Sequence, residues 1–415
     1  MKENWKKKIS LFLTSQSISL FGSSLVQYAI IWYITLKTGS GVMMTIATLC
    51  AFIPQVLISL FAGVWADRYN KKYIIMIADG TIALSTLIIA IFFFSGINDI
   101  WLLFLVLGIR SLGNGVQTPT TTSLIPELVP ESQLMRVNGI NTTVQSIMLI
   151  VSPAISGALL ANVDLQYIFL IDVVTAIIGI SVFSFIKVNH QKKDEEKVAY
   201  FTSIKEGIVY TKNHKFISRM LRYLFMANFL MTPLSLLNPL LVTRTFGSEA
   251  WYLTINEIVF FVGTILGGIV ISSWGGFKNR IYTIGLGSFF FGFLSILIGL
   301  PLSFPVYLIL MGIIGLFSTF VNTPFTTLFQ EKVDADKLGR VFSLITIVSG
   351  TIMPISMILY GPLADIISIE SILIATGILY IIGTIFLVKD KTIKKSLNCD
   401  ENTENKDLQS EKNVI

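Results

Sequence analysis

The decapeptide GVWADRYNKK, residues 63–72, places an Asp, an Arg and two lysines between two long apolar segments. A bilayer core about 30 Å thick takes roughly 20 apolar residues per helix, and the segments on either side of the decapeptide are each long enough to cross it. A short charged turn between two such segments is typical of a hairpin that crosses the membrane twice. The same alternation of apolar runs and short polar breaks continues along most of the chain.

The composition indicates an integral membrane protein. Of the 415 residues, 53% are hydrophobic and only 13% are charged, and the mean hydropathy is +0.73. Soluble globular proteins carry about 25% charged residues. The first apolar run, 9–36, follows a basic start but is too long for a secretory signal peptide and lacks a small-residue cleavage site, so we expect it to remain as the first span.

The apolar runs predict an all-α fold with twelve transmembrane helices in two pseudo-symmetric sets of six. The spans are expected near residues 9–36, 42–66, 73–96, 100–124, 137–161, 165–187, 216–243, 250–273, 281–299, 304–328, 341–364 and 371–388. The corresponding division is an N-terminal six-helix bundle over 1–188, a cytoplasmic linker over 189–215, a C-terminal six-helix bundle over 216–390 and a disordered cytoplasmic tail over 391–415.

The positive charges predict the orientation in the membrane. In the twelve-span arrangement every Lys and Arg except Lys37, Arg110 and Arg244 falls in a segment on one side. Basic residues are retained on the cytoplasmic side of a membrane. We therefore expect a multi-pass protein of the cell membrane with both termini in the cytoplasm.

The second set of spans partly repeats the first. LGIRSLGNGVQTPTTTSLIPELVPESQLMRV (107–137) aligns at a constant offset with MGIIGLFSTFVNTPFTTLFQEKVDADKLGRV (311–341). The matches include the pairs Glu127/Glu331 and Arg136/Arg340, and charged matches across a loop are harder to attribute to chance than apolar ones. Two parallel repeats predict a substrate site near the bilayer midplane, between halves that rock against each other.

Four ionisable residues lie inside the expected spans. Arg110 is near the bilayer centre, where a lone cation costs roughly 2.5–3.5 kcal/mol and usually faces a polar interior. Asp79, Asp172 and Glu257 each lie about two turns inside a span, where a buried carboxyl can bind and release a proton. These four residues are the candidates for proton coupling or substrate contact, with Glu257 preferred for a cationic substrate. Alternatively, Asp79 and Asp172 pair structurally with Arg110.

GVWADRYNKK resembles the loop signature between the second and third helices of the major facilitator superfamily, although Trp65 and Asn70 depart from it. The resemblance implies that Gly63 lets helices two and eleven pack closely. It also implies that Asp67 pairs with a basic residue and holds the inward ends of the two halves together in one state of the transport cycle.

The basic residues of the same loop have two interpretations. By resemblance, Arg68, Lys71 and Lys72 hold the loop at the anionic inner leaflet and belong to the conformational switch. Alternatively, these charges only stop translocation, as in any loop that follows the positive-inside rule.

Two further segments carry the resemblance. The family has an Arg at the place of Arg110 and links it to proton movement, although Asn114 stands here where a Gly is usual. SPAISGALL (152–160) resembles the family's antiporter motif and keeps Pro153 and Gly157. A Pro permits a kink and a small residue permits close helix approach, as a rocking helix pair requires.

The resemblance covers about residues 5–390 and is closest to the macrolide-efflux branch of drug antiporters. FIPQ (52–55), ADRYNKK, LVPESQL and QSIMLIVSPA carry this match. It implies efflux of macrolide-like or other amphipathic drugs by alternating access, driven by the proton motive force. The partners are then a small amphipathic substrate, protons and membrane lipids, and we expect a monomer.

The alternative functions are export of an endogenous metabolite, such as a siderophore or lipid-like compound, and a role as a sensor or scaffold that transports nothing.

The sequence gives no indication of an enzyme. It lacks the GxxxxGK[ST] pattern of ATP-hydrolysing proteins, and His190 and His214 stand alone. The two cysteines, Cys50 and Cys399, lie far apart and form no metal-binding pattern. We therefore expect no catalytic residues, no cofactor, no metal site and no nucleic-acid partner.

Overall fold

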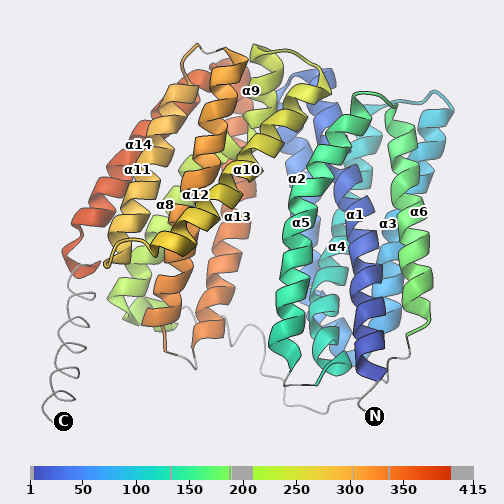
Figure 1. Ribbon diagram of the computed structural model, residues 1–415. Coiled ribbons are helices and arrows are strands. Elements are labelled where there is room, and N and C mark those ends of the chain that lie inside the picture. Colours follow the sequence, from blue (N-terminus) through green and yellow to red (C-terminus); the bar gives the residue numbers. More distant parts are fainter. Residues whose placement is uncertain are drawn as a thin grey trace, which may run out of the picture. The chain divides into compact units, whose positions relative to one another are not determined.

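The computed structural model describes residues 4–130, 133–186, 188, 209–301, 303–334 and 337–393. Regular structure in these ranges is helical, and none of it is strand (Figure 1). Twelve helices of the described part are long and apolar enough to cross a membrane. The predicted all-α, twelve-span fold is therefore confirmed.

The first six helices follow the first six predicted spans. They are α1 (Asn4–Thr38), α2 (Gly41–Arg68), α3 (Lys71–Phe94), α4 (Ile100–Leu128), α5 (Leu134–Leu160) and α6 (Leu165–Ser184). Side-chain caps fix several of their starts, because the Asn70 Oδ1 accepts a hydrogen bond from the Lys72 N–H (3.0 Å) and the Asp99 Oδ1 accepts one from the Trp101 N–H (3.1 Å). Such caps satisfy backbone donors that a helix leaves unpaired at its first turn.

The remaining helices are α8 (Lys215–Leu236), α9 (Asn238–Thr245), α10 (Ala250–Trp274), α11 (Arg280–Ile298), α12 (Phe304–Lys332), α13 (Leu338–Ile366) and α14 (Ile369–Lys389). The span expected near 216–243 is divided between α8 and α9 at Leu237. Pro239 explains the break, since proline lacks an N–H donor and clashes with the preceding turn inside a helix but fits the first turn of a new one.

The chain forms two compact units. One consists of Met1–Glu195 and Pro239–Ile258, and the other of Glu196–Asn238 and Val259–Ile415. The first unit thus takes in α9 and the start of α10, which the sequence placed in the C-terminal bundle. Arg244 contributes to this attachment by donating two hydrogen bonds to the Gly39 carbonyl, at 3.1 and 2.7 Å. Most of the expected linker and nearly all of the expected tail lie outside the described residues.

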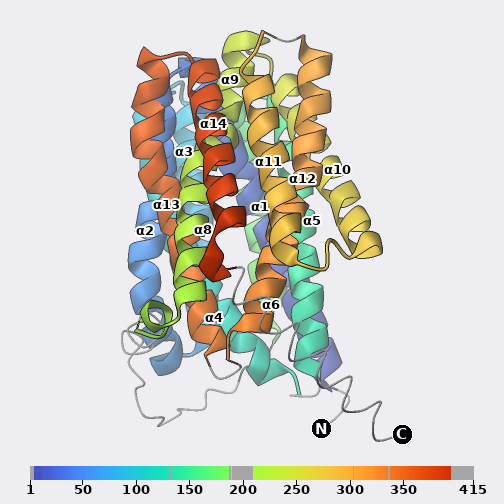
Figure 2. The ribbon, with the colours of Figure 1, turned by 90° about the vertical axis from the view of Figure 1, so that its left-hand side faces the viewer.

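Within the first unit, α1 packs against α5 and α6, α2 against α4, and α3 against α4 and α6 (Figure 1). Buried apolar side chains such as Leu25, Ile30, Phe93 and Phe169 fill the space between these helices. In the second unit, α11 packs against α12 and α14, while α8 packs against α13 and α14 (Figure 2). The polar residues described in the next section lie either between the packed helices of one unit or at a helix end.

An equivalent ion pair in each unit supports the internal repeat. In the first unit, the Lys71 Nζ lies 2.6 Å from the Glu127 Oε1 and joins the start of α3 to the end of α4. In the second unit, the Arg280 Nη2 lies 2.6 Å from the Glu331 Oε1 and joins the start of α11 to the end of α12. Both glutamates belong to the aligned segments of the two halves, and both cations follow an asparagine that caps its helix.

Candidate functional site

A charged pair lies in the interior of the first unit, at membrane depth. Arg110 of α4 is 3% exposed and forms an ion pair with Asp172 of α6, which is fully buried. Arg110 also donates hydrogen bonds to the Ser23 carbonyl (2.9 Å) and to the Thr86 hydroxyl. Asp172 accepts from the Thr86 hydroxyl (2.9 Å) and from the Ser23 hydroxyl (3.2 Å). Both charges are therefore hydrogen-bonded as well as paired.

The bonding of this pair is what makes its burial tolerable. Removing two charges from water costs several kcal/mol per ion, and their attraction offsets that cost only when the remaining donors and acceptors are satisfied. Hydrogen bonds in which one partner is ionised are about twice as strong as neutral ones. The pair is neutral as a whole and links α1, α3, α4 and α6.

A second carboxyl lies in the same interior without a cation. Asp79 of α3 is 3% exposed, and its Oδ1 accepts hydrogen bonds from the Ser19 hydroxyl (3.1 Å) and the Gln117 amide (2.6 Å). The same Gln117 amide reaches the Gln16 Oε1 at 3.4 Å, which also accepts from the Thr121 hydroxyl at 3.3 Å. Among the ion pairs of the described residues, none includes Asp79.

Helix periodicity places these groups in two layers. Asp79 and Thr86 are seven residues apart on α3, and Arg110 and Gln117 have the same spacing on α4. Seven residues make nearly two turns of an α-helix and a rise of about 10 Å, so both members of each pair lie on one face. One layer holds the neutral ion pair and the other holds the lone carboxyl. We call the two layers together the polar network.

The structure thus places three of the four ionisable candidates in the interior of the first unit, with Arg110 and Asp172 in one layer and Asp79 in the other. It also adds Ser19, Ser23 and Thr86, which the sequence analysis did not single out. Glu257 is separate: it is half-buried in α10, and no hydrogen bond or ion pair joins it to any other described residue. Tyr28 of α1 lies within electrostatic reach of Glu257.

The charged loop forms the expected turn between α2 and α3. The Lys71 ammonium also donates to the Ser123 carbonyl (3.1 Å), and the Lys72 ammonium donates to the Ser184 carbonyl (2.5 Å), at the ends of α4 and α6. Arg68 is the last residue of α2 and is exposed. Two of the three cations therefore bind the ends of neighbouring helices within the unit.

Gly63 and Asp67 lie on α2, but the surroundings of Gly63 and the side chain of Asp67 are outside the described part of the structure. The structure explains one departure from the family signature. Asn70, which stands at the usual Gly position, has a φ of −66° and caps α3, so no left-handed conformation is needed there.

The antiporter-like segment lies in α5, where Pro153 and Gly157 are both buried. A Cβ atom added at Gly157 would lie 1.8 Å from the Thr254 Oγ1 and 2.6 Å from the Trp32 Cζ3. Only glycine permits this approach of α5 to α1 and to the start of α10. Gly139 on the same helix offers a contrast, because nothing lies within 4 Å of a Cβ added there.

The substitution Gly157→Ala is expected to destabilise the protein by roughly 1–3 kcal/mol, the usual cost of overpacking a tight interior. The measurement is thermal unfolding of the detergent-solubilised protein. Gly139→Ala is the matched control and is expected not to lower the unfolding temperature, because alanine favours an open helical position over glycine. Equal effects of the two substitutions would show that the close contact at Gly157 is not responsible.

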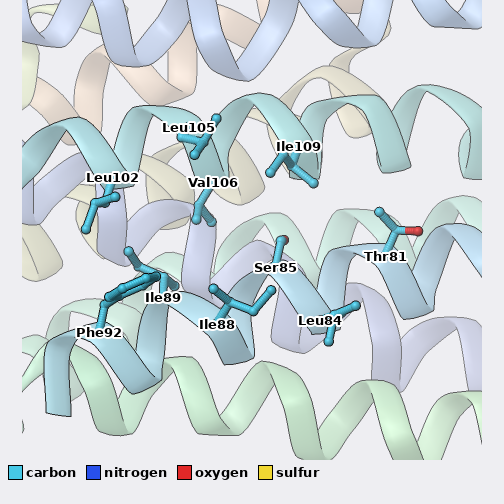
Figure 3. Close-up of a pocket in the computed structure, with 10 residues that line it drawn as sticks. All are labelled: Thr81, Leu84, Ser85, Ile88, Ile89, Phe92, Leu102, Leu105, Val106 and Ile109. Carbon is cyan, nitrogen blue, oxygen red and sulfur yellow. The ribbon is translucent and has the colours of Figure 1, made fainter. Parts of the chain in front are cut away.

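An apolar groove of about 240 Å³ lies between α3 and α4 in the same unit. Figure 3 shows Ser85, Ile88 and Ile89 of α3 facing Val106 and Ile109 of α4 across it. Leucines on its rim are exposed, as expected for a surface in contact with lipid, and it offers only two hydroxyls to a ligand. The polar network is therefore the stronger candidate for a functional site.

The described residues include no group of three His, Cys, Asp or Glu side chains placed to hold a metal ion. The chemistry that the polar network can perform is binding and release of a proton at a buried carboxyl that hydroxyl and amide groups hold in place. The described residues thus combine twelve helices that can cross a membrane with a polar network buried inside the first unit, as in a multi-pass membrane transporter.

The sequence profile described as the Major Facilitator Superfamily matches residues 12–356, and the chain belongs to this family. It is 32% identical over 382 residues to macrolide efflux protein A of Streptococcus pyogenes, covering 91% of this chain and 94% of that protein. It is 30% identical over 323 residues to macrolide efflux protein A of Enterococcus faecalis, covering 77% of this chain and all of that protein. The solved structure of the POT family transporter PepTSo matches with a TM-score of 0.71 at 11% identity, over 95% of this chain and 98% of that one, which supports the fold.

Proposed function

We propose that this protein exports macrolide-like or other amphipathic drugs across the cell membrane by alternating access, driven by the proton motive force. The substrate class is supported by the two macrolide efflux relatives, which align with most of the chain. The coupling to protons is supported by one observation above the others: Asp79 is a buried carboxyl that is hydrogen-bonded but has no cationic partner in the described structure.

In this proposal the two layers of the polar network have different tasks. The pair of Arg110 and Asp172 keeps its charges and holds four helices together. Asp79 binds the proton that is exchanged for the drug. Both hydrogen bonds go to Oδ1, so a proton on Oδ2 leaves them in place and adds a new O–H donor that needs an acceptor. Proton occupancy then changes the packing of α1, α3 and α4 and shifts the equilibrium between two conformations.

The remaining candidate residues act either in the conformational change or, for Glu257, in substrate binding. The antiporter-like segment with Pro153 and Gly157 supplies the close contact of α5 that forms and loosens during the cycle. Gly63 and Asp67, with the cations Arg68, Lys71 and Lys72, form the inner switch. Glu257 contacts the cationic group of a substrate. The basic loops and both termini lie in the cytoplasm, and the protein acts as a monomer.

Cells that express the protein are expected to accumulate less labelled macrolide than cells without it. A transmembrane potential supplies about 2.3 kcal/mol per charge per 100 mV. Dissipating the proton gradient should therefore abolish the difference, whereas depleting ATP while the gradient is maintained should preserve it. Unchanged accumulation in cells whose membranes contain the inserted protein would contradict the proposal.

The Asp67→Asn variant is expected to insert normally and to lose most of its efflux, because the switch contact requires the negative charge. Macrolide accumulation and the amount of protein in the membrane are measured together. Asp67→Glu is the matched control, because it keeps the charge and should retain part of the activity. Full efflux by Asp67→Asn would exclude the switch role of this residue.

A further inference from the structure

A groove of about 270 Å³ lies between the start of α8 and the end of α14 in the second unit. Its walls include Arg219, Arg222 and Met226 from α8 and Phe386 and Asp390 at α14. These residues recur every three or four positions on each helix, so each set lies along one helix face. Arg219 and Asp390 are closest to the helix ends, and Met226 lies furthest into the span.

The charged end of the groove carries excess positive charge. Arg219 forms an ion pair with Asp390. Arg222 is exposed, and its one hydrogen bond among the described residues goes to the Ser218 carbonyl at 3.3 Å. Lys389 and Lys391 flank Asp390 and add two further exposed cations at the same helix end. The single acidic group therefore does not neutralise this end, and the Arg222 guanidinium is available to an anion.

The apolar end of the groove is adaptable and faces the membrane. The Phe386 ring is 72% exposed. A Cβ atom at Gly383 would lie 2.2 Å from the Met226 Cε, so the methionine covers the bare glycine backbone. A methionine side chain is flexible and can move aside for another apolar chain.

The position of the groove along the spans explains why a charged and an apolar end occur together. The candidate spans that contain α8 and α14 run over Lys215–Thr245 and Ile369–Ile393, so Arg219 and Asp390 lie near the span ends. Arg222 and Phe386 lie further in, at equal distances from their span ends, and Met226 lies deepest. Lipid headgroup phosphates lie at the depth of the span ends, and lipid acyl chains lie deeper in the membrane. A guanidinium matches a phosphate in both charge and geometry.

We propose that this groove binds an anionic phospholipid, with its phosphate on Arg222 and Arg219 and the upper part of an acyl chain against Met226 and Phe386. Basic pockets between transmembrane helices are known to select anionic headgroups. A soluble phosphate would leave the apolar half of the groove unfilled. A zwitterionic lipid would offset the attraction with its own positive group.

The test is native mass spectrometry of the purified full-length protein titrated with phosphatidylglycerol. A cation near the membrane surface is worth about 1 kcal/mol towards an anionic lipid, so Arg222→Gln is expected to weaken binding roughly fivefold. Arg222→Lys, which keeps the charge, should lose less affinity. Arg136→Gln, which removes an exposed cation at an end of α5 in the other unit, is the matched control and should leave the affinity unchanged.

Truncation of the exposed ring in Phe386→Ala provides an independent test, because it leaves the charges intact and should weaken binding of phosphatidylglycerol. Phosphatidylethanolamine and free glycerol phosphate serve as the comparison ligands and should bind more weakly than phosphatidylglycerol. Equal losses in Arg222→Gln and Arg136→Gln would show general attraction to charge and overturn the site. Undiminished binding by Arg222→Gln, or equally tight binding of glycerol phosphate, would also overturn it.

Discussion

The Arg110→Met variant is expected to lose macrolide efflux and about 3–5 kcal/mol of stability. The substitution keeps most of the side-chain volume but leaves the Asp172 carboxylate buried without its cation, and a buried charge that loses its partner is costly by this amount. The hydrogen bonds from Ser23 and Thr86 cannot replace the ion pair. Thermal unfolding in detergent and efflux in cells measure the two effects.

The double substitution Arg110→Met with Asp172→Asn separates a structural role of the pair from a role in proton movement. The asparagine is neutral, and its oxygen can accept from one of the Ser23 and Thr86 hydroxyls while its NH2 group donates to the other, so most of the lost stability should return. Replacing both members of a buried ion pair is often close to neutral. Efflux should return with stability if the pair only holds the helices. A stable but inactive double variant would instead assign Arg110 a direct part in moving protons.

The Asp79→Asn variant is expected to bind macrolide but to lose the ability to concentrate it. An amide oxygen can still accept hydrogen bonds from Ser19 and Gln117, while the amide cannot exchange a proton. For a neutral substrate exchanged for one proton, a potential of 100 mV corresponds to roughly a fiftyfold concentration ratio. This ratio should fall to about one in the variant. Uptake of labelled macrolide from the medium into energised everted membrane vesicles provides the measurement.

Two controls accompany this variant. Asp79→Glu keeps a titratable carboxyl and should retain part of the gradient-driven accumulation. Glu257→Gln removes the carboxyl that lies outside the polar network, and it should weaken the binding of cationic macrolides while neutral substrates are still concentrated. Full accumulation by Asp79→Asn would exclude this residue as the proton carrier.

The sequence was sufficient for the fold because burial in lipid imposes long apolar helices, and charged breaks such as the one at 63–72 mark their ends. It also identified Arg110, Asp79 and Asp172 as candidates, since ionisable groups are rare inside spans. It could not decide whether either carboxylate pairs with Arg110. That choice depends on how α3, α4 and α6 rotate against one another, which apolar periodicity does not specify.

The sequence also could not show which serine and threonine hydroxyls contact the buried charges of the polar network. Serine and threonine in membrane helices commonly return a hydrogen bond to the carbonyl four residues earlier, as Thr35 and Thr45 do here. Thr86 makes the same local bond and in addition contacts Asp172, so only packing distinguishes it. The sequence feature that could have identified Thr86 was its spacing of seven residues from Asp79. The break between α8 and α9 could have been inferred from Pro239.

The most direct test of proton-coupled efflux uses proteoliposomes with a pH-sensitive dye in the lumen and equal pH on both sides. Macrolide added outside is predicted to enter in exchange for protons, so the luminal pH should rise with the wild-type protein. The Asp79→Asn variant should show no such rise. Entry of macrolide without a change in luminal pH, a fall in that pH, or an unchanged rise in the Asp79→Asn variant would contradict the account.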